Sequence, residues 1–290
     1  SDVCSSDLGH GNNYVTNNGQ DIVFDAANAT SNNQYIDNIS GTGTLRVTGG
    51  GRLELNDARH GTFTGTTTID SGATLELQYG KLDGDITNNG TLYFNNPQTI
   101  DYGGVISGSG SFKQNSGTLY LTGANTYTGT TSIGPDSGAN LYLGHLGTTG
   151  SLASTSDISI GSGSTLFFNR SDAMTVANNI SGTGNVWLKT QNGTSGEAKS
   201  EIVTLTGNNT YTGSTVLEAY TQLQLGDGHD FGSLSSSSLI YMGLGTNLIS
   251  NRSDNVTIAN ELIRWDSWGP GDYGNDFIQN GTGPQLSHLI

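Results

Sequence analysis

The stretch from Trp265 to Tyr273 gathers residue types that can contact a carbohydrate. It reads Trp-Asp-Ser-Trp-Gly-Pro-Gly-Asp-Tyr. Aromatic faces stack on sugar C–H surfaces, and carboxylates accept hydrogen bonds from hydroxyl groups. Trp265, Asp266, Trp268, Asp272 and Tyr273 therefore form the candidate ligand-binding site of this sequence. The alternative is that the tryptophans only seal the end of a core, because the open end of a repeat protein needs covering.

Metal binding is the chemistry suggested by the run Gly226-Asp227-Gly228-His229-Asp230. Its two carboxylates could bind a cation, but Ca²⁺ takes about six to eight oxygen ligands, and one such loop does not supply them. A turn is the favoured interpretation. The five histidines show no metal-ligand spacing; they are His10, His60, His145, His229 and His288. The sequence predicts no bound metal and no cofactor.

Catalysis has little support in the residue pattern. Acid–base work on polysaccharides needs clustered carboxylates, and the acidic residues here are scattered along the sequence. The motif Asn-Arg-Ser-Asp occurs at Asn169–Asp172 and again at Asn251–Asp254. Because the same motif occurs at two separate positions, a structural corner of the coil, in which the arginine pairs with a nearby residue, is favoured over a catalytic site. With no nucleophile elbow, phosphate loop or thiol site, we predict no catalytic residue.

The charge balance excludes several classes of partner. Ten Lys and Arg face 25 Asp and Glu, for a net charge of −15. Nucleic acid and anionic membrane surfaces both require basic faces, so neither is an expected partner. No apolar run approaches the ~18 residues of a membrane helix. Cys4 is the single cysteine, and internal disulfides are therefore excluded. Residues 1–8 resemble the translation of a common sequencing adapter, and we treat them as an expected artefact outside the fold.

The elements that would position these residues are short repeated strands. Between Gly117 and Leu143 the chain alternates Leu with other residues in two runs, separated by Gly, Asn, Ser and Thr. Such alternation between turn residues is typical of strands. The same sequence pattern recurs at Val203–Gly213 and, less clearly, at Leu53–Leu77. A strand-turn-strand unit that repeats buries its apolar side by stacking on its own copies.

A longer period contains these strands. Similar segments end at Ile39, Ile106, Ile180 and Leu262, so the offsets are 106 − 39 = 67, 180 − 106 = 74 and 262 − 180 = 82. Each period then holds about three coils of roughly 20–25 residues, which is within the range for solenoid repeats. No segment has the i, i+3, i+4, i+7 pattern of a helix.

These patterns predict an all-β fold, a single-stranded parallel β-helix. Its hand should be right, by the crossover rule for parallel strands. We assign residues 9–265 to the β-helix and residues 266–290 to a truncated segment that is irregular or begins further coils. Leu121 and Leu205 should point inward. The turn aromatics Phe63, Tyr127 and Tyr211 could stack on sugars, but packing inside the coil is the favoured interpretation.

Two segments carry a family resemblance. Leu119-Tyr-Leu-Thr-Gly-Ala-Asn-Thr-Tyr-Thr-Gly-Thr-Thr131 and Leu205-Thr-Gly-Asn-Asn-Thr-Tyr-Thr-Gly-Ser-Thr215 resemble the autotransporter-associated β-strand repeat of bacterial passenger domains. The resemblance implies a secreted right-handed β-helix displayed at the cell surface, associated with the outer membrane. It also implies that the membrane is contacted only through a C-terminal barrel domain, which is missing from this sequence along with an export signal.

Two functional hypotheses follow. The first is a non-enzymatic passenger fragment that acts as stalk or adhesin, with host or matrix glycans or proteins as partners. The second is a polysaccharide-active β-helix enzyme, a lyase or glycoside hydrolase. A carboxylate cluster on one sheet face would favour the second.

Overall fold

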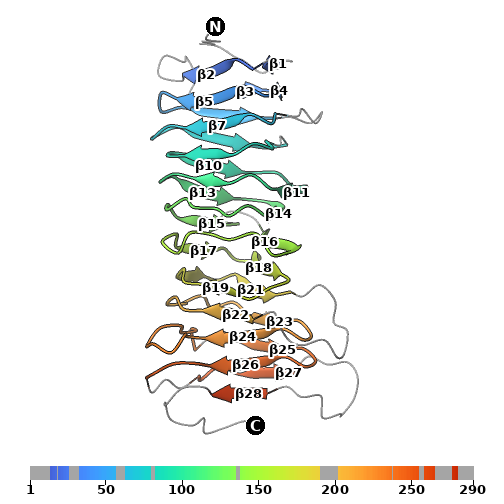
Figure 1. The fold of residues 1–290 in the computed structure, drawn as a ribbon, viewed down its shortest axis with the longest axis vertical. Coiled ribbons are helices and arrows are strands. Elements are labelled where there is room, and N and C mark those ends of the chain that lie inside the picture. Colours follow the sequence, from blue (N-terminus) through green and yellow to red (C-terminus); the bar gives the residue numbers. More distant parts are fainter. Residues whose placement is uncertain are drawn as a thin grey trace.

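The computed structural model describes residues 14–17, 19–25, 33–56, 63–79, 82–134, 138–189, 202–236, 238–254, 258–264 and 276–279. Within these ranges the chain forms strands, bridges and turns but no helix. All strand pairings are parallel. Figure 1 shows the coils stacked along one axis, from the blue N-terminal strands to the red C-terminal ones. The prediction of an all-β solenoid is confirmed.

Two sheets of eight strands run along the stack. Sheet 1 contains β3 (Asn33–Ile36), β6 (Arg52–Leu55), β8 (Thr74–Leu77), β10 (Thr91–Phe94), β13 (Ser111–Gln114), β15 (Thr131–Ile133), β17 (Ile158–Ile160) and β20 (Ile180–Gly182). Sheet 2 contains β11 (Thr99–Tyr102), β14 (Gly117–Leu121), β16 (Ala139–Gly147), β18 (Thr165–Arg170), β21 (Asn185–Leu188), β23 (Thr215–Leu217), β25 (Ile240–Met242) and β27 (Leu262–Arg264).

Two sheets of five strands and one of two complete the coils. Sheet 3 contains β2 (Asp21–Asp25), β5 (Thr44–Thr48), β7 (Thr66–Ile69), β9 (Ile86–Asn88) and β12 (Ile106–Ser107). Sheet 4 contains β19 (Met174–Val176), β22 (Ile202–Leu205), β24 (Gln222–Leu225), β26 (Asn247–Ser250) and β28 (Asp276–Gln279). The short pair is β1 (Tyr14–Asn17) with β4 (Asn38–Gly41). From β17 to β22 the chain passes from sheet 1 to sheet 2 and then to sheet 4 in each coil, so these coils have three sides. From β23 onward its described strands alternate between sheets 2 and 4.

The core is the column of inward side chains. Leu119 pairs in register with Leu141, which pairs with Leu166, so like residues lie above one another. Leu121 and Leu205 are fully buried, which confirms their predicted inward orientation. Apolar surface removed from water in this way contributes about 25 cal/mol per Å². Phe63, Tyr127 and Tyr211 are also fully buried, so the turn aromatics pack inside the coil and are not open to sugars.

Buried asparagines tie successive coils together. The Asn125 Oδ1 accepts from the Ile106 backbone N at 2.9 Å, and its Nδ2 donates to the carbonyls of Gly123 and Ser151, both at 3.1 Å. Asn209 makes the same three bonds one long repeat later. Each side chain thus gives a backbone N–H its acceptor and adds a donor to two corner carbonyls, and unpaired buried groups are costly.

The long sequence period is not a whole number of coils. From β4, parallel bridges lead to Phe63 and then Leu82, and the chain occupies β11 before it reaches Ile106 in β12. Ile39, Ile106, Ile180 and Leu262 therefore lie in four different sheets. Each period therefore spans about three coils, as predicted, and one more side of the following coil. The hand of the coil stays a prediction.

Candidate functional site

The predicted ligand site lies outside the described residues. Trp265, Asp266, Trp268, Asp272 and Tyr273 all fall in the range 265–275. These five residues remain a proposal. The other candidates can be placed.

The Asp227–Asp230 loop is a turn, as the sequence favoured. The His229 Nδ1 lies 2.9 Å from the Asp227 Oδ1, and both side chains are exposed. Asp230 accepts hydrogen bonds from Ser253 at its carboxylate and from the Arg252 guanidinium at its backbone carbonyl. In the described part of the chain, no group of three or more His, Cys, Asp and Glu could hold a metal ion.

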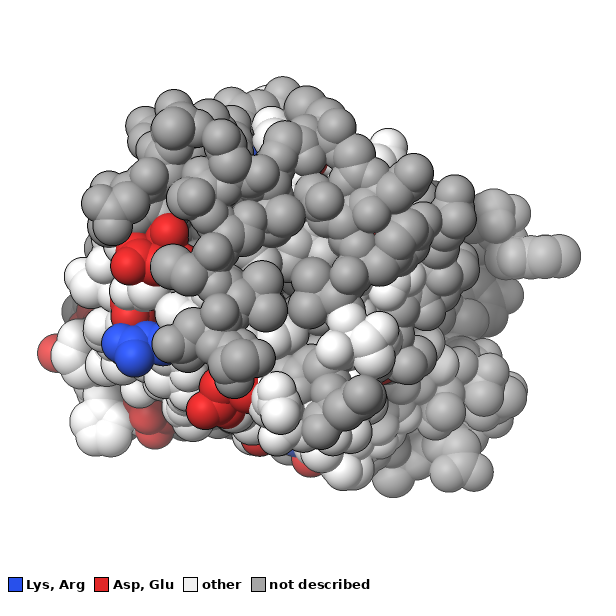
Figure 2. Space-filling model, turned by 90° about the horizontal axis from the view of Figure 1, so that it is seen from above, with Lys and Arg blue, Asp and Glu red and all other residues white. Residues whose placement is uncertain are grey.

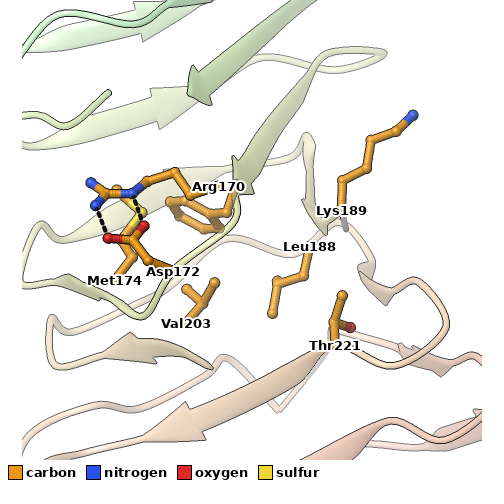
Figure 3. Close-up of a pocket in the computed structure, with 8 residues that line it drawn as sticks. Arg170, Asp172, Met174, Leu188, Lys189, Val203 and Thr221 are labelled. Atoms are coloured by element: carbon orange, nitrogen blue, oxygen red, sulfur yellow. Dashed lines mark hydrogen bonds and ion pairs between the residues drawn. The ribbon is translucent and has the colours of Figure 1, made fainter. Parts of the chain in front are cut away.

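The repeated Asn-Arg-Ser-Asp motif forms a corner with a local ion pair. Arg170 donates through Nε and Nη2 to the two carboxylate oxygens of Asp172, each at 2.8 Å (Figure 3). Arg252 and Asp254 repeat this geometry at 2.8 and 2.6 Å. The arginine holds the pKa of Asp172 below its usual value, chiefly through this hydrogen bond. The pocket drawn in Figure 3 measures about 10 Å³, room for no more than a single water, so this corner is structural.

One pair of carboxylates does come together, which corrects the scattered pattern read from the sequence. Glu54 and Glu76 are register neighbours on β6 and β8. Arg52 forms an ion pair with each of them, and Asn95 donates to the Glu76 Oε1 at 3.0 Å. Only 6% of Glu54 and none of Glu76 is exposed. The pair is therefore closed to a polymeric substrate.

The most distinctive outward surface is a row of aromatic side chains on sheet 2, which we call the aromatic ladder. Tyr120, Tyr142, Phe167 and Trp187 occupy equivalent positions on β14, β16, β18 and β21, each paired in register with the next. Each lies between two inward apolar residues, so the pleat directs it out of the core.

The ladder rings stack on one another. The ring centroids of Tyr120 and Tyr142 are 4.4 Å apart, those of Tyr142 and Phe167 are 4.1 Å apart, and those of Phe167 and Trp187 are 5.6 Å apart. The Tyr142 and Phe167 rings are parallel within 1°. Such stacking stabilises by about 0.5–1.5 kcal/mol per pair beyond area burial. The facing sides of the rings are therefore occupied within the ladder. Phe167 is buried, whereas Tyr120, Tyr142 and Trp187 stay partly exposed.

The N-terminal end of the ladder is polar. His145 stacks on Tyr120 with a centroid distance of 4.1 Å, and its Nδ1 lies 2.9 Å from the Asp101 Oδ2. Asp101 is the register neighbour of Tyr120 on β11. Burial, assisted by Tyr120 and Glu218, raises the pKa of Tyr142 to about 12. Tyr142 is therefore a neutral hydroxyl at physiological pH.

The C-terminal end of the ladder is hollow. Val216 follows Trp187 in register on β23, and Tyr241 follows Val216 on β25. A hollow of about 290 Å³ lies here, lined by Asn185, Trp187, Ser214, Val216 and Tyr241. The described residues that line it carry no formal charge, and its volume lies near the lower end of the range typical of small-molecule sites.

The described surface at one end of the stack offers no basic face. Figure 2 shows acidic side chains spread over the described part of this end, with basic atoms confined to one small area. The net charge of the chain is −15, and the absence of nucleic acid and anionic membranes among its partners stays a prediction. Within the described residues, no helix is long and apolar enough to cross a membrane.

The sequence carried a signal for the ladder that our reading missed. In β14, β16 and β21 the residue between the two inward apolar positions is aromatic: Tyr120, Tyr142 and Trp187, respectively. A solvent-facing strand position is usually polar. An aromatic residue at these outward positions indicated an unusual surface, but the sequence alone did not show that the three strands lie on the same sheet.

Two segments of the chain match a known repeat family. The model of the passenger-associated-transport repeat matches residues 112–134 and 200–219. These segments contain the two buried asparagines, Asn125 and Asn209, and the buried Tyr127 and Tyr211. The chain carries the repeats of an autotransporter passenger.

A curated relative agrees with this assignment. The chain is similar to the adhesin BmaC autotransporter of Brucella suis biovar 1, with 32% identity over 188 residues, which cover 59% of this chain. The match spans about 5% of the length of that adhesin. No solved structure matches the chain. Passengers are exposed at the cell surface on proteins associated with the outer membrane, and the repeats give this chain the same location.

Proposed function

We propose that this passenger segment is a non-enzymatic, adhesin-like surface that binds its partner along sheet 2. The observation that carries the proposal is the aromatic ladder with its polar and hollow ends. Four large side chains, from Tyr120 to Trp187, form one outward row where solvated strands usually carry polar residues. Tyr120, Tyr142 and Trp187 are partly exposed, and Phe167 is buried between its neighbours. Partly exposed aromatic side chains gathered on one surface mark interaction sites. The similarity to an adhesin supports the same role.

The alternative, a polysaccharide lyase or glycoside hydrolase, has weaker support. Hydrolysis needs two carboxylates on either side of a bound sugar, with space between them for the scissile bond. Glu54 and Glu76 are neighbours on one face but are buried and paired with Arg52. Their arrangement resembles a structural ion cluster, in which the arginine compensates buried charge.

The partner class follows from charge and side-chain chemistry. Tyrosine hydroxyls and ring edges suit host or matrix glycans and proteins that present neutral polar groups. With a net charge of −15 the chain repels polyanions at long range. We therefore place neutral glycans first among the partners and polyanionic matrix components last.

Binding of the purified chain to arrays of host glycans and matrix proteins tests the proposal. The informative variant is Tyr120→Thr with Tyr142→Thr, because Val203-Thr204-Leu205 carries Thr at the position of Tyr120 in the other repeat copy. Thr is therefore compatible with the strand. A matched control is Ser132→Thr on sheet 1, which changes an outward residue away from the ladder.

The expected result is binding by the parent and the control and at least a tenfold loss in the double variant. Equal binding by all three proteins would move the site away from sheet 2. Release of reducing ends or unsaturated products from a polysaccharide panel, abolished by Glu54→Gln, would replace the adhesin proposal with the enzymatic one.

A further inference from the structure

The ladder is interrupted by one small residue at a defined rung. Trp187, Val216 and Tyr241 are consecutive register partners on β21, β23 and β25. The outer rungs carry large aromatic rings, whereas the middle rung carries a side chain with no ring. The 290 Å³ hollow lies at this interruption. Val216 is 9% exposed and forms its floor.

The width of the interruption is set by strand spacing. Neighbouring strands lie about 4.8 Å apart, so two rungs separate Trp187 from Tyr241 by about 9.6 Å. A guest ring midway would lie about 4.8 Å from each wall. Filled rungs of the ladder stack at 4.1, 4.4 and 5.6 Å. The space therefore admits one further ring between the two walls, and the groups at its rim decide which kind of ring suits it.

The described residues at the rim of the hollow are polar and carry no charge. The Asn185 Oδ1 accepts a hydrogen bond from the Ser214 backbone N at 2.9 Å, which fixes the orientation of the amide. The Asn185 amide and the Ser214 hydroxyl are polar side-chain groups among the described residues that line the hollow, and the Tyr241 hydroxyl is a third. Amide and hydroxyl groups donate to and accept from sugar hydroxyls. None of the described residues that line the hollow is charged, and the chain carries a net charge of −15, so a neutral ligand is favoured over an anionic one.

We propose that the slot between Trp187 and Tyr241, above Val216, binds one pyranose ring of a neutral glycan. The two aromatic side chains cover the apolar faces of the sugar, and Asn185 and Ser214 bind its hydroxyl edge. This inference rests on the proposed function and names the ligand class of the same sheet-2 surface.

Isothermal titration calorimetry of the full chain with chitotetraose tests the slot. This probe is a neutral β-linked tetramer whose rings present axial C–H faces to both sides. Val216→Trp continues the aromatic row and fills the space, so affinity should fall at least tenfold. Trp187→Lys removes one wall and should have the same effect; Lys113 stands at the equivalent position of the other repeat copy, after Phe112, so the strand accepts it. Ser132→Trp on sheet 1 is the matched control and should bind as the parent does.

Each alternative outcome is decisive. A parent that does not bind chitotetraose, or a Val216→Trp variant that is folded by circular dichroism and binds as tightly as the parent, overturns the slot. Tighter binding of N-acetylphenylalaninamide than of the sugar would assign the slot to an aromatic side chain of a protein partner instead. Array binding that is lost in the Tyr120/Tyr142 double variant but unchanged by Val216→Trp leaves the adhesin proposal standing and removes only the slot.

Discussion

At the scale of single residues, buried polar side chains decide whether a coil can close. Asn125 is 2% exposed and pairs three backbone groups from three segments of the chain. The Asn125→Ala variant leaves the Ile106 N–H without its acceptor, whereas the Gly123 and Ser151 carbonyls keep backbone donors. An unpaired buried group costs about 1–3 kcal/mol, and we expect urea unfolding followed by circular dichroism to show a loss of stability of that size.

The control for this variant is Thr126→Ala. Thr126 is adjacent and exposed, and its backbone N donates to the Ile106 carbonyl whatever its side chain is. The free energy of unfolding of Thr126→Ala should lie within about 0.5 kcal/mol of that of the parent, as is usual for surface positions. Equal losses in the two variants would mean that the Asn125 side chain does not stabilise the corner.

Buried phenols make stability depend on alkaline pH. Burial raises the pKa of Tyr127 and Tyr211 above the ordinary value, although hydrogen bonds to Thr131 and Thr215 act in the opposite direction. A raised folded-state pKa means that the folded chain prefers the neutral phenol. Burial of the neutral phenols therefore stabilises the fold fully below about pH 10, which is the pKa of tyrosine in the unfolded chain. This stabilisation is lost as the pH rises through and above that value.

The measurement is phenolate absorbance as a function of pH, with circular dichroism in parallel. The absorbance of the buried tyrosines should appear only together with unfolding. Tyr211→Phe should make the alkaline loss of stability shallower, at a cost of about 0.5–1.5 kcal/mol at neutral pH for the hydrogen bond to Thr215. Full ionisation near pH 10 by a chain that keeps its β spectrum would contradict this account.

Single residues also limit what could be read from the sequence. The inward Leu121 and Leu205 were predictable, because apolar residues at alternate positions must face the same side of a strand. The outward Tyr120 and Trp187 were not recognised as partners, because their contact depends on which strands share a sheet. The pairing of Glu54 with Glu76 was missed for the same reason.

At the scale of the element, close contact between coils constrains the corners. A Cβ on Gly123 would lie 2.3 Å from the Gly104 carbonyl oxygen, and a Cβ on Gly104 would lie 2.7 Å from that of Gly84. These glycines form a column in which one backbone rests on the next. The strand repeat was readable from sequence, but this column was not, since only the stacked structure shows which glycines touch.

Gly123→Ala should therefore be destabilising. The added methyl group meets backbone, which cannot rotate away, and overpacking of this kind costs about 1–3 kcal/mol or more. Gly147→Ala is the matched control, because its Cβ would have no atom within 4 Å and its φ is not in the left-handed region. Thermal melts of the two variants should differ clearly; a Gly123→Ala melt that coincides with that of Gly147→Ala would show that the coils separate more easily than the structure indicates.

At the scale of the whole molecule, the repeat in sequence and the repeat in space have different lengths. The strand after each long-repeat anchor is β5 on sheet 3, then β13 on sheet 1, then β21 on sheet 2. Equivalent sequence thus occupies each side of the coil in turn. The aromatic ladder on sheet 2 is assembled from different positions of the repeat, so its composition could not be predicted by aligning repeat copies.

The unit that can be removed is therefore the coil and not a fragment of it. Leu119 and Leu141 are register partners, so deletion of residues 119–140 removes 141 − 119 = 22 residues and joins Thr118 to a second Leu-Tyr-Leu strand. That strand can then stack on β11 as β14 did. Because solenoid stability is approximately a sum of coil and neighbour terms, the shortened chain should fold and unfold cooperatively.

A deletion of residues 119–129 is the contrasting variant. It joins sheet 2 directly to the segment that enters β15 and omits the corner held by Asn125. The chain cannot then travel around the core, and the inward residues that follow lose the coil beneath them. Urea titration followed by circular dichroism should show one sharp transition for the coil deletion and a broad or absent one for the half-coil deletion. Equal transitions would mean that stacking in register is not what specifies this fold, whereas the expected contrast would identify the three-sided coil as its unit of stability.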